Sequence, residues 1–142
     1  MKKIWYAPYK FESYGEEEIQ AVVESLKSGW LGGQGPKSIK FEQKIAKRFG
    51  KKYGVFVNSG SSACLLAIAS LDLPKGSKII TPACTFATTL APIIQLGYKP
   101  VFVDVGLTNY VANIDQIVNS ITPEVKAIML PNLIGNKQIG VD

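Results

Sequence analysis

The residues with the clearest chemical potential lie where a short apolar segment runs through serine and glycine into a second apolar segment. The sequence YGVFVNSGSSACLLAIA predicts a strand over residues 53–57 and a helix over 61–71. The first turn of a helix leaves backbone N–H groups unpaired at the positive end of the helix dipole, so it attracts phosphate. Gly60 permits close approach, and Ser59, Ser61 and Ser62 add hydroxyl donors. The junction is a candidate phosphate site, although these residue types are also ordinary in a turn and a helix N-cap.

The elements that position this junction follow a regular order. Amphipathic patterns predict helices over 16–27 and 36–50, joined by the glycine-rich loop GWLGGQG. Further along the chain we predict strands over 78–81, 100–104 and 125–130, alternating with helices over 86–96 and 113–120. The strands are apolar without alternation, which is typical of a sheet covered on both faces. Strand, helix and strand at this spacing predict an α/β fold with a mainly parallel sheet and flanking helices.

The predicted strand ends carry the unusual residues of the chain. They read NSGSS, TPACTF, DV and PNLIGN. Ligands of a parallel α/β sheet bind beyond the carboxyl ends of its strands, so all four segments are expected at one edge. Phe86, within TPACTF, offers an aromatic face to a flat ligand, although such a residue is more often part of a core. The convergence favours a phosphate site over a simple turn.

Several function classes are excluded by what the sequence contains. The stretch Gly35-Pro36-Lys37-Ser38 is interrupted by proline and follows no strand, so it is not a nucleotide-binding P-loop. With no histidine and only two cysteines, we expect no metal site. No apolar run approaches the roughly 20 residues of a membrane helix, and no signal peptide is apparent, so we expect a cytoplasmic protein without a membrane partner.

The charge is positive, but its distribution does not indicate nucleic-acid binding. The net charge is +5, from 16 basic and 11 acidic residues. Seven cations fall between Lys37 and Lys52, opposed only by Glu42. The two aromatic residues of this segment, Phe41 and Phe49, fall on the predicted inward face of the helix, and the cluster is poor in the residues that read base edges. We therefore expect a solvated helix face and no nucleic-acid partner.

Four segments resemble, in order and spacing, the N-terminal part of the DegT/DnrJ/EryC1/StrS family of sugar-nucleotide aminotransferases. They are SGWLGGQGPKSIKFEQ, VNSGSSACLLAIASL, IITPACTFATTLAPIIQLGYKPVFVDV and VKAIMLPNLIGN. The resemblance implies part of the large domain of the type I fold, which uses pyridoxal 5'-phosphate (PLP). On this basis residues 1–52 form an N-terminal helical segment with a glycine-rich loop, and residues 53–142 form an incomplete PLP-binding α/β domain.

The resemblance also implies roles for particular residues. Ser61 and Ser62, beside Gly60, would hold the phosphate of PLP or of pyridoxamine 5'-phosphate (PMP), and Phe86 would stack on the cofactor ring. In the family, the aspartate at the ring nitrogen and the lysine that carries the cofactor come later in the chain. The catalytic residues are therefore expected beyond Asp142.

The implied activity is aminotransfer to a keto-sugar nucleotide in amino- or deoxy-sugar biosynthesis for a surface polysaccharide, by an enzyme expected to be a homodimer. Asn132 stands where many aminotransferases carry histidine, and this is similar to family members that act as PMP-dependent 3-dehydratases. Asn132 and Trp30 are candidate substrate contacts. Two other classes stay open: a catalytically silent fragment or dimerisation module without the lysine, and a different phosphate binder such as a nucleotide module.

Overall fold

The chain divides into two compact units, of which the computed structural model describes residues 14–138. The first unit ends at Phe56 and the second begins at Val57. The sequence-based division lay between residues 52 and 53. Residues 1–13 of the predicted N-terminal segment and residues 139–142 of the predicted α/β domain lie outside the described part.

The first unit contains two helices joined by the glycine-rich loop. They are α2, Glu16–Ser28, and α3, Pro36–Arg48, and both predicted helices are confirmed. At the start of α2 the carboxylate of Glu18 accepts a hydrogen bond of 2.7 Å from the Gly15 N–H. This bond stabilises the charged form and lowers the pKa of Glu18. Gly29 ends α2 with φ 77°, a left-handed conformation that favours glycine.

The strand predicted over residues 53–57 is wrong, because these residues form no ladder and Gly54 and Phe56 pack on α3 instead. The Phe56 N–H donates to a carboxylate oxygen of Glu42 over 2.8 Å. The rings of Phe41 and Phe56 meet edge to face with centroids 5.3 Å apart. Gly54 lies so close to the helix that an added Cβ would stand 2.6 Å from the Glu42 carbonyl oxygen. An apolar run fits a helix surface as well as a sheet, and only a ladder partner makes it a strand.

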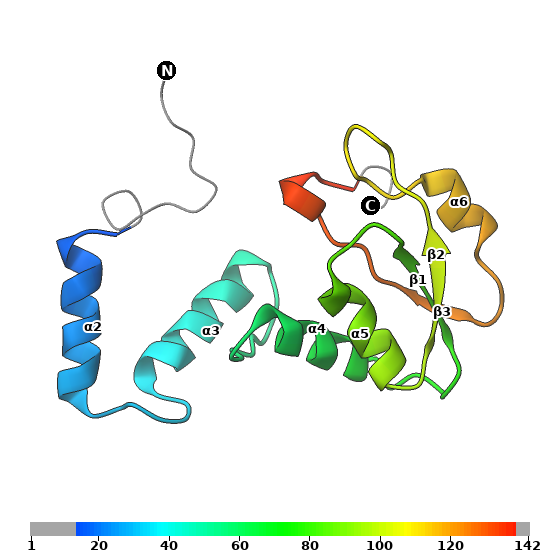
Figure 1. The fold of residues 1–142 in the computed structure, drawn as a ribbon. Coiled ribbons are helices and arrows are strands. Elements are labelled where there is room, and N and C mark those ends of the chain that lie inside the picture. The colour runs from blue at the N-terminus through cyan, green and yellow to red at the C-terminus, as the bar shows by residue number, and fades with distance from the viewer. Residues whose placement is uncertain (1–13, 139–142) are drawn as a thin grey trace, which may run out of the picture. The chain divides into compact units, whose positions relative to one another are not determined.

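The second unit is a parallel sheet with helices on both faces (Figure 1). The strands are β1, Lys78–Pro82, β2, Lys99–Val103, and β3, Val125–Ile128, in the order β2-β1-β3. The helices are α4, Gly60–Ala69, α5, Ala87–Gln95, and α6, Ile114–Asn119, and the 3-10 turn η1, Leu133–Gly135, follows β3. The predicted α/β class is confirmed, with a sheet of three strands instead of four. Between residues 14 and 138, no helix is long and apolar enough to cross a membrane.

The central strand β1 is buried because its side chains alternate between two covered faces. Ile79 packs with Ile68 of α4 and Ile93 of α5. Ile80 packs on the other face with Ile117 of α6. Each buried isoleucine contributes about 1.5–3 kcal/mol of transfer free energy, so these two layers hold the helices on the sheet.

Thr81 is a buried polar residue of β1 with an unpaired hydroxyl. Its side chain is 0% exposed, and its Oγ1 has no hydrogen-bond partner in the described structure. Because an unpaired buried hydroxyl is unfavourable relative to a methyl group, we expect Thr81→Val to raise the free energy of unfolding by about 1–2 kcal/mol in urea denaturation. The exposed control Thr108→Val should change it by less than about 0.5 kcal/mol. A loss of stability in Thr81→Val would show that the hydroxyl is hydrogen-bonded.

An ion pair between Lys78 and Glu124 joins the start of β1 to the residue before β3. Its hydrogen bond and charge lower the pKa of Glu124. Because the pKa of Glu124 is lower in the folded state than in the unfolded state, the ion pair stabilises the fold at pH values above the unfolded-state pKa. This stabilisation is lost as the pH falls through the folded-state pKa. We therefore expect Glu124→Gln to be slightly less stable than the wild type at neutral pH, with the two converging in acid, in unfolding curves measured against pH. Lys78→Met should remove the same pH dependence from the free energy of unfolding. If Lys78→Met retains this pH dependence, the ion pair is not its source.

Candidate functional site at the start of α4

The start of α4 is built from hydrogen bonds among serine and asparagine side chains. Ser59 caps the helix, and its Oγ accepts a hydrogen bond of 3.1 Å from the Ser62 N–H. The Ser62 hydroxyl donates to Oδ1 of Asn58 over 2.7 Å. Both polar groups of Ser62 are therefore engaged in the cap. The residue types predicted the cap, but not that both the N–H and the hydroxyl of Ser62 are engaged in it.

Gly60 and Ser61 carry the free donors of this turn. Their backbone N–H groups have no acceptor within residues 14–138, and the Ser61 hydroxyl has no partner there either. A Cβ added to Gly60 would meet no atom within 4 Å, so the space beside it is open. These donors stand at the positive end of the α4 dipole. We call residues 59–62 the α4 cradle, a site suited to an anion.

A pocket of about 320 Å³ adjoins the α4 cradle. Its lining includes Ser61, Ser62 and Leu65 of α4 and Thr88, Pro92 and Gln95 of α5. Pro92 has no N–H, so it cannot donate to the Thr88 carbonyl one turn earlier, and that carbonyl lacks its usual helical donor. The pocket is therefore lined by Ser61, which carries free donors on α4, and by the Gln95 side chain on α5. Small-molecule sites have volumes of roughly 300 Å³ or more.

Phe86 occupies the N-cap position of α5, with φ −71° and ψ 143°. Its side chain is 72% exposed, so in the described structure it is not a core residue. It precedes Thr88, a lining residue of the pocket, by two positions. The structure thus exposes an aromatic ring at the start of the helix that forms one wall of the pocket.

These residues fit a ligand that combines a phosphate with a flat ring. The unpaired N–H groups of Gly60 and Ser61 fit the phosphate, because a helix N-terminus offers donors and positive potential together. The exposed ring of Phe86 fits an aromatic ring, because offset stacking favours such pairs. The chemistry of the site agrees with the PLP site that the resemblance implies.

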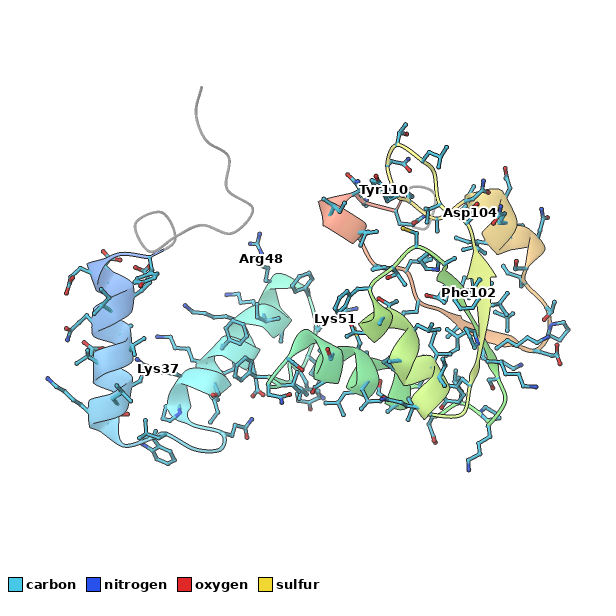
Figure 2. The ribbon with its side chains drawn as sticks, viewed as in Figure 1. Lys37, Arg48, Lys51, Phe102, Asp104 and Tyr110 are labelled. Carbon is cyan, nitrogen blue, oxygen red and sulfur yellow. The ribbon has the colours of Figure 1, made fainter. Side chains whose placement is uncertain are left out.

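Polar loops follow the carboxyl ends of the other two strands. Asp104 comes directly after β2 (Figure 2), and its N–H donates to Oε1 of Gln116 over 2.6 Å. Asp104 Oδ1 in turn accepts from the Val105 N–H over 2.8 Å. Asn132 follows β3 and is exposed, and its Oδ1 accepts a hydrogen bond of 3.2 Å from the Gln138 N–H. Side-chain hydrogen bonds therefore order both segments, with Gln116 of α6 taking part in the first.

Gln138, in the loop after β3, is hydrogen-bonded to the loop after β2. Its side chain accepts from the Ala112 N–H over 3.1 Å and donates to the Ala112 carbonyl over 2.9 Å. Asn136 adds a hydrogen bond of 2.8 Å to the carbonyl of Asn109, next to Tyr110 (Figure 2). Gln138 was not predicted from the sequence, because a side chain that binds the backbone 26 residues away gives no periodic pattern in the sequence.

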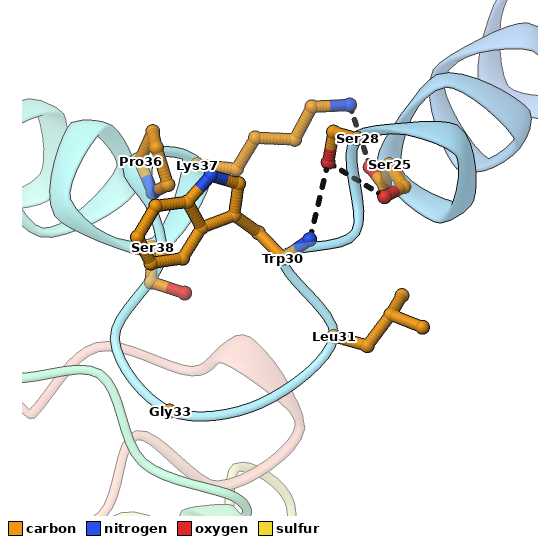
Figure 3. A pocket seen from close by; sticks show the side chains of 9 residues that line it. Ser25, Ser28, Trp30, Leu31, Gly33, Pro36, Lys37 and Ser38 are labelled. Atoms are coloured by element: carbon orange, nitrogen blue, oxygen red, sulfur yellow. Dashed lines mark hydrogen bonds between the residues drawn. The ribbon is translucent and has the colours of Figure 1, made fainter.

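Trp30 lines a second pocket, of about 330 Å³, within the first unit (Figure 3). Trp30 is 65% exposed, and its backbone N–H donates to Oγ of Ser28 over 3.4 Å. Nζ of Lys37, from α3, reaches back to α2 and donates to the Ala21 carbonyl at 2.7 Å and to Oγ of Ser25 at 2.6 Å. This cation therefore joins the two helices on either side of the glycine-rich loop. The pocket offers an aromatic face and serine hydroxyls.

The α4 cap leads to a prediction for two neighbouring serines. Ser59→Ala should lower the free energy of unfolding by about 1 kcal/mol, because it removes the acceptor of the Ser62 N–H. Ser61→Ala is the matched control and should leave stability almost unchanged, because its hydroxyl is free in the described structure. Urea denaturation of both variants measures the difference. Equal losses would mean that the Ser61 hydroxyl is also part of the cap.

The chain belongs to the DegT/DnrJ/EryC1/StrS aminotransferase family, whose model matches residues 12–139. The predicted family is thereby confirmed. The chain is 38% identical over 130 residues to the spore coat polysaccharide biosynthesis protein SpsC of Bacillus subtilis, covering 90% of this chain and 33% of SpsC. It is 44% identical over 129 residues to the dTDP-4-dehydro-2,6-dideoxy-D-glucose 3-dehydratase of Saccharopolyspora spinosa, covering 85% of this chain and 28% of that enzyme. The chain thus spans about a third of the length of these relatives.

Solved structures agree with this assignment. The PLP form of the putative sugar aminotransferase Spr1654 of Streptococcus pneumoniae matches with a TM-score of 0.78 and 30% identity, over 87% of this chain and 31% of that one. A variant of GDP-4-keto-6-deoxymannose-3-dehydratase (ColD) with bound GDP-perosamine matches with a TM-score of 0.76 and 35% identity, over 82% of this chain and 31% of that one. The fold is therefore that of the type I PLP-dependent sugar aminotransferases.

Proposed function

We propose that this chain is the N-terminal portion of a PLP-dependent aminotransferase that acts on a keto-sugar nucleotide. The observation that carries the proposal is the pair of unpaired N–H groups at Gly60 and Ser61, at the start of α4 in a chain of this family. A helix start with free donors suits the phosphate by which PLP is held. The substrate, the reaction and the cofactor of the whole protein are inferred together from this site and from the relatives.

Each residue of the site has a distinct task in this proposal. The N–H groups of Gly60 and Ser61 and the Ser61 hydroxyl bind the phosphate. Ser62 acts through the cap, because its N–H and hydroxyl hold the turn that presents those donors. Phe86 supports one face of the ring. When bound, PLP supplies an electron sink for bonds broken next to the substrate nitrogen.

The proposed substrate is supported by what the relatives are named for. SpsC is named for spore coat polysaccharide biosynthesis, and the ColD variant was solved with GDP-perosamine. Trp30 and Asn132 are the proposed substrate contacts. The exposed indole of Trp30 suits the apolar face of a sugar ring, and the exposed amide of Asn132 suits sugar hydroxyls.

A PMP-dependent sugar-nucleotide 3-dehydratase is the second candidate. Two observations favour it. The chain is 44% identical to a dTDP-sugar 3-dehydratase and 35% identical to ColD, a 3-dehydratase of a GDP-sugar. Asn132 also stands in the position where the resemblance places histidine in many aminotransferases.

We also propose the setting in which the enzyme works. It would be a cytoplasmic homodimer that supplies a modified sugar for a surface polysaccharide such as lipopolysaccharide. The relation to SpsC supports the polysaccharide role. Light scattering on the purified full-length protein measures its oligomeric state, and a monomer would contradict the dimer.

Cofactor binding by the full-length protein tests the proposed site. We expect PLP to bind, and Ser61→Ala to weaken binding by about tenfold or more, because the phosphate loses a charge-assisted hydrogen bond. Ser70→Ala, at the other end of α4, is the control and should bind as the wild type does. A titration followed by the absorbance of PLP gives both dissociation constants. The site is refuted if PLP does not bind or if the two variants behave alike.

The products separate the two candidate reactions. The full-length protein is incubated with PLP or PMP, an amino donor and a 4-keto-6-deoxy sugar nucleotide. The masses of the products are then measured by mass spectrometry. Aminotransfer replaces the carbonyl oxygen with an amine, whereas 3-dehydration removes the 3-hydroxyl as water. We expect the first result, and the second would establish the dehydratase in its place.

A further inference from the structure

Two threonine hydroxyls bracket Phe86 at the start of α5. Oγ1 of Thr85 donates to Oγ1 of Thr89 over 2.9 Å. The Thr89 N–H also donates to the Phe86 carbonyl over 2.9 Å. The residue before Phe86 and the residue three positions after it are thereby joined across the turn that carries the ring.

The Thr85–Thr89 hydrogen bond stabilises the first turn of α5, which the N-cap residue Phe86 cannot do with its side chain. A phenylalanine has no side-chain acceptor, and α5 accordingly has no side-chain cap bond at Phe86. The first turn is instead closed by the Thr85–Thr89 bond and by the Phe86 carbonyl. The position that a capping residue normally occupies is thus free to hold an aromatic ring.

Thr89 ties this turn to the core of the second unit. Thr89 is only 6% exposed. It precedes Ile93, a 0% exposed residue that packs with Ile68 and Ile79, by one helical turn. As a β-branched residue it has few χ1 rotamers, so burial fixes the direction of its hydroxyl. Phe86 is 72% exposed, and its backbone φ and ψ determine where the ring is attached and which rotamers it can adopt. By restraining that backbone, Thr89 narrows the positions open to the ring.

We propose that Thr89 is a positioning residue for the cofactor. Through its hydrogen bond to Thr85 it holds the backbone of Phe86 so that the ring is already placed when the cofactor arrives. Such preorganisation strengthens binding, because less conformational freedom is lost when the ligand binds. The role rests on the proposed function, since it concerns the ring that Phe86 is proposed to support.

The first test uses the full-length protein without cofactor. Thr89→Val keeps the shape of the side chain and removes its hydroxyl. We expect faster hydrogen–deuterium exchange in a peptide covering residues 83–90 than in the wild type. Thr81→Val makes the same change at a buried threonine whose hydroxyl has no partner in the described structure, so it should exchange no faster than the wild type. Exchange in Thr89→Val that is no faster than in the wild type would overturn the positioning role.

The second test measures PLP binding. Thr89→Val should weaken it about threefold to tenfold, the usual range for one neutral hydrogen bond, and Thr89→Ser should restore it. If Thr89 acts through Phe86, then Thr89→Val should have no further effect in a Phe86→Leu background. Should Thr89→Val fail to fold, Thr85→Val removes the same bond from its less buried end.

The outcomes separate this role from the proposed function. If the wild type binds PLP and Phe86→Leu weakens binding while Thr89→Val does not, the positioning role is overturned and the proposed function stands. Additive effects of Thr89→Val and Phe86→Leu would likewise overturn it. If the wild type binds no PLP, the proposed function fails, and the role of Thr89 fails with it.

Discussion

The unpaired N–H groups in the first turn of α4 are the feature on which the rest of the account depends. A helix start always has such groups, which are satisfied by a side-chain cap, by water or by a ligand. Here the cap formed by Ser59, Asn58 and Ser62 satisfies the Ser62 N–H and leaves those of Gly60 and Ser61 free within the described residues. The free donors therefore follow from how the cap is arranged. An anion completes the turn without displacing any hydrogen bond that the structure shows.

The sheet keeps that turn in place through the buried side chains of β1. Ile79 packs against α4 and α5, and Ile80 packs against α6. The helix α5 also carries Thr89, whose hydrogen bond with Thr85 spans the turn that contains Phe86. The proposed phosphate site and the proposed ring support are thus positioned by one apolar layer. This layer connects the packing of the core with the binding of a cofactor.

The sequence predicted what depends on local pattern and missed what depends on distant partners. The helices and three strands followed from local apolar patterns and turn residues, and the family followed from the motifs, which the match over residues 12–139 confirms. The predicted strand over 53–57 was wrong because periodicity does not specify a partner, and Glu42 and Phe41 of α3 supply the contacts instead. Gln138 went unnoticed for the same reason, since its partner Ala112 lies on another loop. Serine and glycine indicated a cradle at 59–62, but only geometry shows that Ser62 is engaged and Ser61 is free.

A crystal structure of the full-length protein with PLP tests the central claim most directly. The account predicts phosphate oxygens within roughly 3 Å of the amide nitrogens of Gly60 and Ser61, with the cofactor ring stacked on Phe86. It is contradicted if the phosphate binds elsewhere while those two amides still face solvent.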